Sequence, residues 1–64
     1  KGKAVFEITH RNSNTTIFWH LDHTYIGETK NIHRMEIDPK PGKHKMTLVD
    51  DQGETLNFNF EIMD

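Results

Sequence analysis

The sequence predicts an all-β protein, a small immunoglobulin- or fibronectin-like antiparallel β-sandwich of six to seven strands. Apolar and polar residues alternate with a period of two along most of the chain, and helical periodicity is nearly absent. Turn-forming residues recur about every 8–12 residues, a spacing typical of sandwiches. The single tryptophan, Trp19, shares a strand face with Ile17 and Leu21. Immunoglobulin-like sandwiches bury a tryptophan in this position, so we expect Trp19 at the centre of the core.

Three strands are predicted in the first half of the chain. Residues 4–9 alternate between apolar and polar, and a polar turn cluster follows at 11–14. Residues 16–22 form the second strand, and a tight reversal at 22–24 joins it to a return strand. Gly27 interrupts that return strand. We therefore expect a β-bulge or a close backbone contact at this glycine.

The second half of the chain predicts three more strands. Residues 33–38 alternate, and a loop must follow at 38–42, because its two prolines cannot both take part in a ladder. Residues 43–50 alternate again and end in a short hairpin turn at 51–53, where Gly53 supplies a positive φ. The last strand has an apolar stripe that we expect to face the core, formed by Leu56, Phe58, Phe60 and Ile62.

The outer face of this last strand is polar and carries little charge, with Thr55, Asn57, Asn59 and Glu61 opposite the apolar stripe. If the strand lies at a sheet edge, it is able to accept a partner strand through its unpaired backbone groups. The same composition also fits an aggregation liability. The sequence leaves both interpretations open.

Length and composition exclude several classes of protein. The 64 residues make one small domain, 1–64, and its start at Lys1, close to the first strand, suggests a C-terminal fragment of a larger protein. Ten acidic and eight basic residues give a net charge of −2, so the chain lacks the positive excess that nucleic acid binding needs. It has no cysteine for a disulfide. No apolar run reaches the roughly 20 residues of a membrane helix, so we expect no membrane insertion.

Catalytic constellations are poorly supported. The single serine, Ser13, lies in a polar turn without the sequence context of a nucleophile. Asp50 and Asp51 are adjacent in a predicted hairpin turn, where side chains point to opposite sides, and a glycosidase needs two carboxyls facing one cleft. We therefore interpret these aspartates as turn formers and expect no catalytic activity from this domain.

Five histidines raise the question of a metal site. His20 and His23 flank Asp22 at a hairpin end, but strand alternation points His20 outward while His23 sits in the turn. His33 and His44 look inward or toward the rim, and we expect them to be packing residues with one ring nitrogen hydrogen-bonded. We expect neither a metal nor another cofactor.

Surface recognition is the remaining function that the residues suggest. Phe18, His20 and Tyr25 are predicted to lie exposed around the first hairpin, and they are our candidate interaction surface. Tyr25 could also stack on a sugar ring, as aromatic residues do in carbohydrate-binding sandwiches. A free-standing cell-surface adhesion or carbohydrate-binding sandwich is therefore the alternative function.

The order of these segments resembles one family, the C-terminal β-domain of bifunctional, class A penicillin-binding proteins of the 1C type. Residues 5–11 look like its opening strand, and 17–27 resemble its hairpin, in which a Trp-x-Leu-Asp turn leads to an aromatic-aliphatic-glycine triplet. Residues 33–37 are similar to its middle strand, 41–53 to its last hairpin and 60–62 to its closing strand. The resemblance covers almost the whole chain, although His23 stands in a turn where the family usually has glycine.

This resemblance implies a function that composition does not reveal. The parent protein is expected to be a periplasmic enzyme anchored in the inner membrane, with a glycosyltransferase domain that polymerises lipid II and a transpeptidase domain that crosslinks stem peptides. The catalytic serine and lysine of such a parent have no counterpart in this sequence. The domain itself is expected to be a non-catalytic accessory module. Its expected partner is the transpeptidase domain of the same protein, a periplasmic protein or peptidoglycan.

Overall fold

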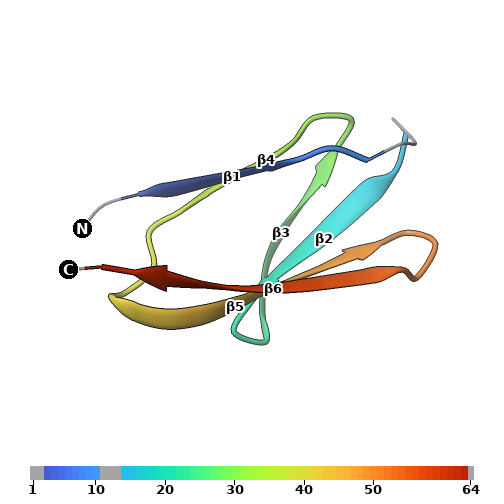
Figure 1. Ribbon diagram of the computed structural model, residues 1–64. Helices are drawn as coiled ribbons and strands as arrows, with labels where there is room; N and C mark the ends of the chain where they lie inside the picture. Colours follow the sequence, from blue (N-terminus) through green and yellow to red (C-terminus); the bar gives the residue numbers. More distant parts are fainter. Residues whose placement is uncertain (1–2, 11–13, 64) are drawn as a thin grey trace.

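The computed structural model describes residues 3–10 and 14–63, and within these it contains six strands and no helix (Figure 1). This described part therefore holds no helix able to cross a membrane. The strands form two antiparallel sheets that face each other, which confirms the predicted all-β sandwich. Their bounds are β1 (Ala4–Ile8), β2 (Thr16–Leu21), β3 (Thr24–Lys30), β4 (His33–Ile37), β5 (Gly42–Asp50) and β6 (Thr55–Ile62).

The two sheets are unequal in width. The larger sheet has the strand order β3-β2-β5-β6. The smaller sheet pairs β1 with β4, in a register that places Ala4 opposite Ile37. Figure 1 shows β1 and β6 running along the same side of the sandwich, one at the edge of each sheet. Aromatic contacts join these two edges, since the ring of Phe6 lies 5.7 Å from that of Phe58 and 4.9 Å from that of Phe60.

The core lies between the sheets and is centred on Trp19, whose side chain is fully buried as predicted. Ile17, Met46 and Leu48 complete the buried cluster. Partly buried apolar side chains from both sheets pack around it: Phe6, Ile8, Leu21, Ile26, Met35, Ile37, Phe58 and Phe60. Alternation therefore sorts the residues as expected, because successive side chains of a strand point to opposite faces.

The first hairpin turns through two residues, Asp22 and His23, with φ values of 50° and 73°. Two positive φ values are the mark of a type I′ turn, whose twist matches that of the strands. The tight reversal is confirmed, and Thr24 at its end is the first residue of β3. His23 adopts the conformation for which glycine is usual, and its side chain stays exposed in the turn.

Gly27 lies at the bulge that the sequence predicts. The β2–β3 register shifts between Trp19, which faces Gly27, and His20, which faces Tyr25. Gly27 has φ +143°, and a Cβ placed on it would lie 3.4 Å from the Met35 methyl group. The glycine therefore permits the backbone conformation of the bulge, and it lies within van der Waals reach of Met35 on β4.

One core expectation is wrong. Leu56 lies on the inner side of β6 but is 55% exposed. The reason is the width of the sheets: β6 is an edge strand, and the two strands of the smaller sheet leave its first residues partly uncovered. The turn expected at 11–14 lies mostly outside the described residues, and Asn14 alone of it is placed, in a turn.

Candidate interaction site

The three predicted interaction residues lie together on the outer face of the larger sheet. Phe18 and His20 alternate with the buried Trp19 on β2, and Tyr25 faces His20 across the β2–β3 pair. Val49 of β5 is the neighbour of Phe18 on its other side. We call these four residues the outer-face patch. Sequence reasoning found three of them and missed Val49, which belongs to another hairpin and meets Phe18 only when β2 pairs with β5.

Tyr25 gives the outer-face patch its exposed ring. It is 53% exposed, and its ring packs edge-on against His20 with the ring centroids 5.6 Å apart. Its hydroxyl donates a hydrogen bond to Oε1 of Glu28 over 3.1 Å. Partial burial, and then the Glu28 carboxylate, raise the pKa of Tyr25 above its ordinary value of 10.0. The hydroxyl therefore remains neutral at physiological pH and stays a hydrogen-bond donor.

A second cluster fastens the first hairpin turn to β5. Oδ2 of Asp22 lies 2.6 Å from Nδ1 of His44, and the other ring nitrogen of His44 lies 2.6 Å from the Lys40 carbonyl oxygen. The second carboxylate oxygen of Asp22 accepts the Lys45 backbone N–H over 2.9 Å. We call these side chains, Asp22 and His44, the hairpin latch. Sequence reasoning missed it, because 22 residues separate its members.

Both ring nitrogens of His44 face acceptors, an arrangement that only the doubly protonated imidazolium satisfies. The hydrogen bond to Asp22, and then that to Lys40, accordingly raise the pKa of His44 above 6.5. The hydrogen bond from His44, followed by that from the Lys45 backbone, lowers the pKa of Asp22 below 3.8. These groups form an internal ion pair beside an open hollow of about 600 Å³. Each charge of the pair is compensated by the other, so the pair stabilises the contact between the first hairpin turn and β5 and offers neither a free acid nor a free base.

The adjacent aspartates of the last hairpin have separate structural roles. Oδ1 of Asp50 accepts the backbone N–H groups of Gln52 and Glu54 over 2.9 and 2.8 Å, and Oδ2 lies 3.1 Å from Nε2 of His10. Burial opposes ionisation of Asp50, but the bonds from Glu54 and His10 outweigh it and lower its pKa. Asp51 instead accepts the backbone N–H of Thr16 over 3.3 Å. The aspartates are turn formers, as predicted.

A buried polar chain runs behind the outer-face patch. The indole Nε1–H of Trp19 donates to Oγ1 of Thr29 over 2.9 Å, and that hydroxyl lies 2.8 Å from Nδ1 of His33. His33 is buried, and desolvation, followed by the nearby His10, lowers its pKa below 6.5. The expectation that His33 packs with one ring nitrogen hydrogen-bonded is confirmed, while its Nε2 has no partner among the described residues.

The model of the Penicillin-Binding Protein C-terminus Family matches residues 1–60, which include β1 to β5 and most of β6. The chain belongs to this family. No significant match was found among curated proteins or among solved structures. The expected resemblance is thus confirmed at the level of a penicillin-binding protein C-terminal domain. It makes the chain an accessory domain of a penicillin-binding protein.

This penicillin-binding protein domain shows, in residues 3–10 and 14–63, no group of three or more histidine, cysteine or acidic side chains placed to hold a metal ion. His20 contacts Tyr25, and His23 is exposed in the turn on the other side of Asp22. Ser13, the single serine, which the sequence gives no context of a nucleophile, lies outside the described residues. What the described chain offers chemically is a surface of aromatic, imidazole and aliphatic groups.

Proposed function

We propose that this chain is the non-catalytic accessory C-terminal domain of a bifunctional, class A penicillin-binding protein of the 1C type, and that it docks a protein through the outer-face patch. In this proposal residues 1–64 form one immunoglobulin-like domain at the end of a longer peptidoglycan synthase. The parent is anchored in the inner membrane, and the domain lies in the periplasm. The observation that carries the proposal is the family match over residues 1–60, on a chain whose outer sheet face gathers the exposed ring of Tyr25 and the half-buried rings of Phe18 and His20.

The composition of the patch supports binding to a protein. Interfaces combine an apolar centre with a polar rim, and aromatic residues are enriched in them. Phe18 and Val49 are paired neighbours at the centre, while Glu28 and Thr47 flank them on the adjoining strands. Tyr25 adds a ring with a hydroxyl that stays protonated. The partner in this proposal is the transpeptidase domain of the same protein or another periplasmic protein.

The shifted titratable groups support a non-catalytic role. The carboxylates of Asp22 and Asp50 each accept backbone N–H groups, and each also lies beside a histidine ring nitrogen. A general acid or base needs a proton that it can exchange with a bound substrate. In this fold the two carboxylates are instead occupied by hydrogen bonds within turns and loops, as expected of structural residues.

Binding of peptidoglycan is the second candidate, favoured by the 53% exposure of Tyr25. Sugars stack on flat and accessible rings, and Tyr25 is the exposed ring of the outer-face patch. Protein docking is nevertheless the better supported function, because Tyr25 is held edge-on by His20 and its hydroxyl is already bound to Glu28.

The test is an amide NMR titration of the chain at fixed pH, with the transpeptidase domain of the parent and, separately, with soluble peptidoglycan fragments. We expect saturable shifts on β2 and β3 with the protein, weakened by Tyr25→Ala. Ile32→Ala is the matched control, because Ile32 is 74% exposed and lies in the β3–β4 turn. Shifts with the glycan fragments alone would establish the second candidate.

The family assignment within the proposal has its own test. The gene that encodes this chain should specify, upstream, the Ser-x-x-Lys and Lys-Thr-Gly motifs of a transpeptidase. A parent without those motifs would contradict the peptidoglycan synthase assignment, whatever the titration shows.

A further inference from the structure

The strands that border the two sheets differ in how well their edges are protected. Free edges invite pairing with other chains, and proteins block them with short strands, bulges, charges or proline. Of the described strands, β3 borders the larger sheet beside a bulge and carries the exposed Glu28 and Lys30. In the smaller sheet β1 and β4 have five residues each, and β4 presents Arg34 and Glu36 outward.

The β6 strand lacks these protections. Its eight residues contain no proline, no glycine and a single charge, Glu61, near one end. Its pairing with β5 is continuous from Val49–Thr55 to Gly42–Ile62. β6 is therefore a long and regular edge whose other side meets no strand within the described residues.

The backbone groups at this edge can be assigned from the hairpin. The Asp50 N–H donates to the Glu54 carbonyl, and the Asp22 N–H donates to the Lys45 carbonyl on the other side of β5. Bonded and non-bonded pairs alternate along an antiparallel ladder. The even-numbered residues of β6 therefore bond to β5. The backbone groups of the odd-numbered ones face the open edge: Thr55, Asn57, Asn59 and Glu61.

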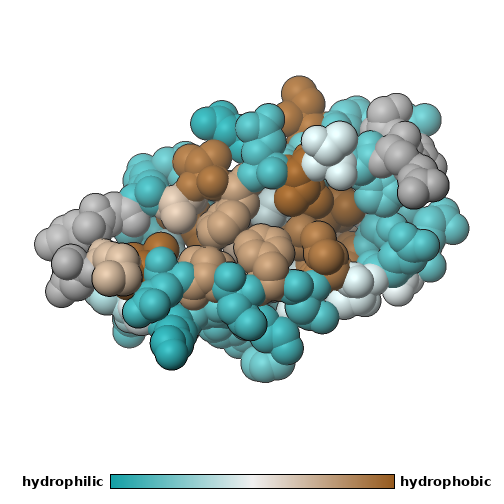
Figure 2. Space-filling view, viewed as in Figure 1, coloured by the Kyte–Doolittle hydropathy of each residue, from teal (hydrophilic) through white to brown (hydrophobic). Residues whose placement is uncertain are grey.

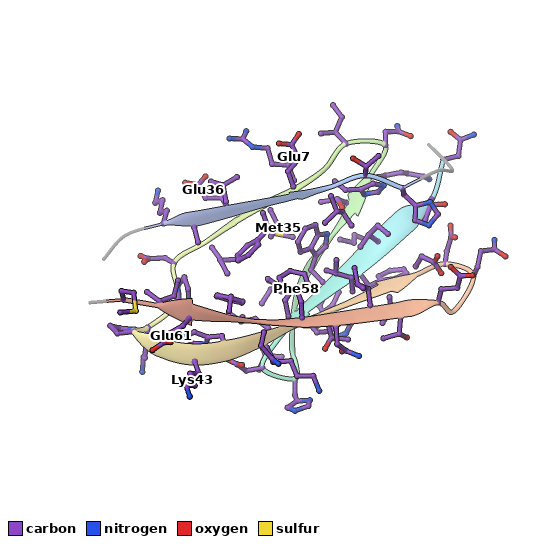
Figure 3. The ribbon with its side chains drawn as sticks, in the orientation of Figure 1. Glu7, Met35, Glu36, Lys43, Phe58 and Glu61 are labelled. Carbon is purple, nitrogen blue, oxygen red and sulfur yellow. The ribbon has the colours of Figure 1, made fainter. Side chains whose placement is uncertain are left out.

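The apolar side chains beside that edge are incompletely covered. Figure 2 shows apolar residues gathered in a band along this side of the molecule, between β1 and β6. Phe58 points from β6 into the space between the sheets, on the side of Met35, whereas Glu61 and Lys43 lie on the opposite side of the larger sheet (Figure 3). Leu56 is 55% exposed at the start of the same strand. The edge thus joins unpaired backbone to partly exposed apolar surface.

We propose that two copies of this chain pair through β6, antiparallel about a two-fold axis at Phe58, to form a continuous sheet across the dimer. This axis brings all four residues with edge-facing backbone groups into bonded pairs, Asn57 with Asn59 and Thr55 with Glu61 of the second copy. An axis at Asn59 instead leaves Thr55 opposite Met63, beyond the strand, and gives three bonded pairs within the strands rather than four.

The side chains fit this register on both faces of the sheet. On the inner face, Phe58 meets Phe58 of the second copy, and the exposed Leu56 meets Phe60. On the outer face the lone charge of the strand, Glu61, faces Thr55, so no like charges are opposed. Directly opposite pairs of this kind stabilise a sheet, and like charges there destabilise it. In an isologous pair both copies contribute the same strand, so neither β6 edge remains free after pairing. The other edge of the larger sheet, β3, is protected against further pairing, and the assembly therefore stops at two chains.

Paired charge variants test both the dimer and its register. Asn57→Lys with Asn59→Lys places lysine opposite lysine twice across the axis. Asn57→Lys with Asn59→Glu places lysine opposite glutamate instead. Both double variants lose the hydrogen bond from Thr47 Oγ1 to Asn57 Oδ1, so this loss is matched between them. Circular dichroism is used to check that both double variants fold.

Sedimentation equilibrium from about 10 μM to about 1 mM, a range that covers weak association, is the measurement. For the wild-type chain we expect a mass that rises toward twice 7.5 kDa. The double lysine variant should dimerise at least about tenfold more weakly, and the lysine–glutamate variant as well as wild type. A wild-type monomer at about 1 mM, growth beyond two chains, or equal weakening by both variants would overturn the proposal. The dimer uses the open backbone edge of β6 and none of the four patch side chains, although Val49 of the patch neighbours Thr55 on β6. Loss of the dimer in the lysine variant and loss of docking in Tyr25→Ala are therefore separate outcomes.

Discussion

The hydroxyl of Thr29 is the most informative group to remove. It accepts the Trp19 indole N–H and also contacts His33 Nδ1, and so it links the central core residue to the buried histidine of the smaller sheet. Thr29→Val keeps the shape and the β-branch, which β-strands favour, while it deletes both hydrogen bonds. The substitution therefore separates polar satisfaction from packing.

The expected cost follows from the groups left behind. A net hydrogen bond contributes about 1 kcal/mol, and leaving its buried partner unsatisfied costs about 1–3 kcal/mol. Thr29→Val removes two such bonds in a partly buried position, and burial of the added methyl group returns about 0.8 kcal/mol. The free energy of unfolding should therefore fall by about 2 kcal/mol. A domain of 64 residues has a free energy of unfolding of about 3–10 kcal/mol. Thr29→Val therefore removes a large share of the total stability.

Urea denaturation monitored by Trp19 fluorescence measures this loss, and the thermal midpoint should fall by about 8–16 °C. Thr29→Ser keeps the hydroxyl and should retain most of the stability. Thr24→Val, at an exposed position of the same strand, is the control for the change in residue type. The reasoning is refuted if Thr29→Val stays within about 0.5 kcal/mol of wild type, or if Thr29→Ser is equally destabilising.

Two further predictions concern the hairpin latch and the bulge. The raised pKa of His44 stabilises the fold fully below its ordinary pKa of 6.5, and this stabilisation is lost as the pH rises through the raised value. The lowered pKa of Asp22 stabilises the fold above its ordinary pKa of 3.8, and this stabilisation is lost as the pH falls through the lowered value. His44→Gln should therefore lower the thermal midpoint most between about pH 4 and 6.5, and a wild-type minus variant difference that does not vary with pH would argue against an imidazolium there. Gly27→Ala should cost about 1–3 kcal/mol, because alanine is strained at φ +143° and its Cβ contacts Met35; an unchanged midpoint in urea denaturation would show that the bulge relaxes freely.

Local pattern was sufficient to predict much of this fold. A period of two assigns each side chain to a face before any partner strand is known, which is why the burial of Trp19 and the outward position of Phe18 were predictable. Turn residues mark where strands end, and Gly27 marked the bulge. The candidate interaction residues followed from the same rule, since Phe18, His20 and Tyr25 belong to one hairpin.

The sequence by itself determined which residues face inward, where the chain turns and, through the order of its segments, the family to which it belongs. Only the tertiary structure decided which strands become neighbours, because pairing depends on contacts between residues far apart in the chain. Val49 joins Phe18, His44 binds Asp22 and Asp50 meets His10 for that reason. The exposure of Leu56 has the same origin: alternation points it inward, but the placement of β6 at the edge of a wider sheet leaves it partly uncovered.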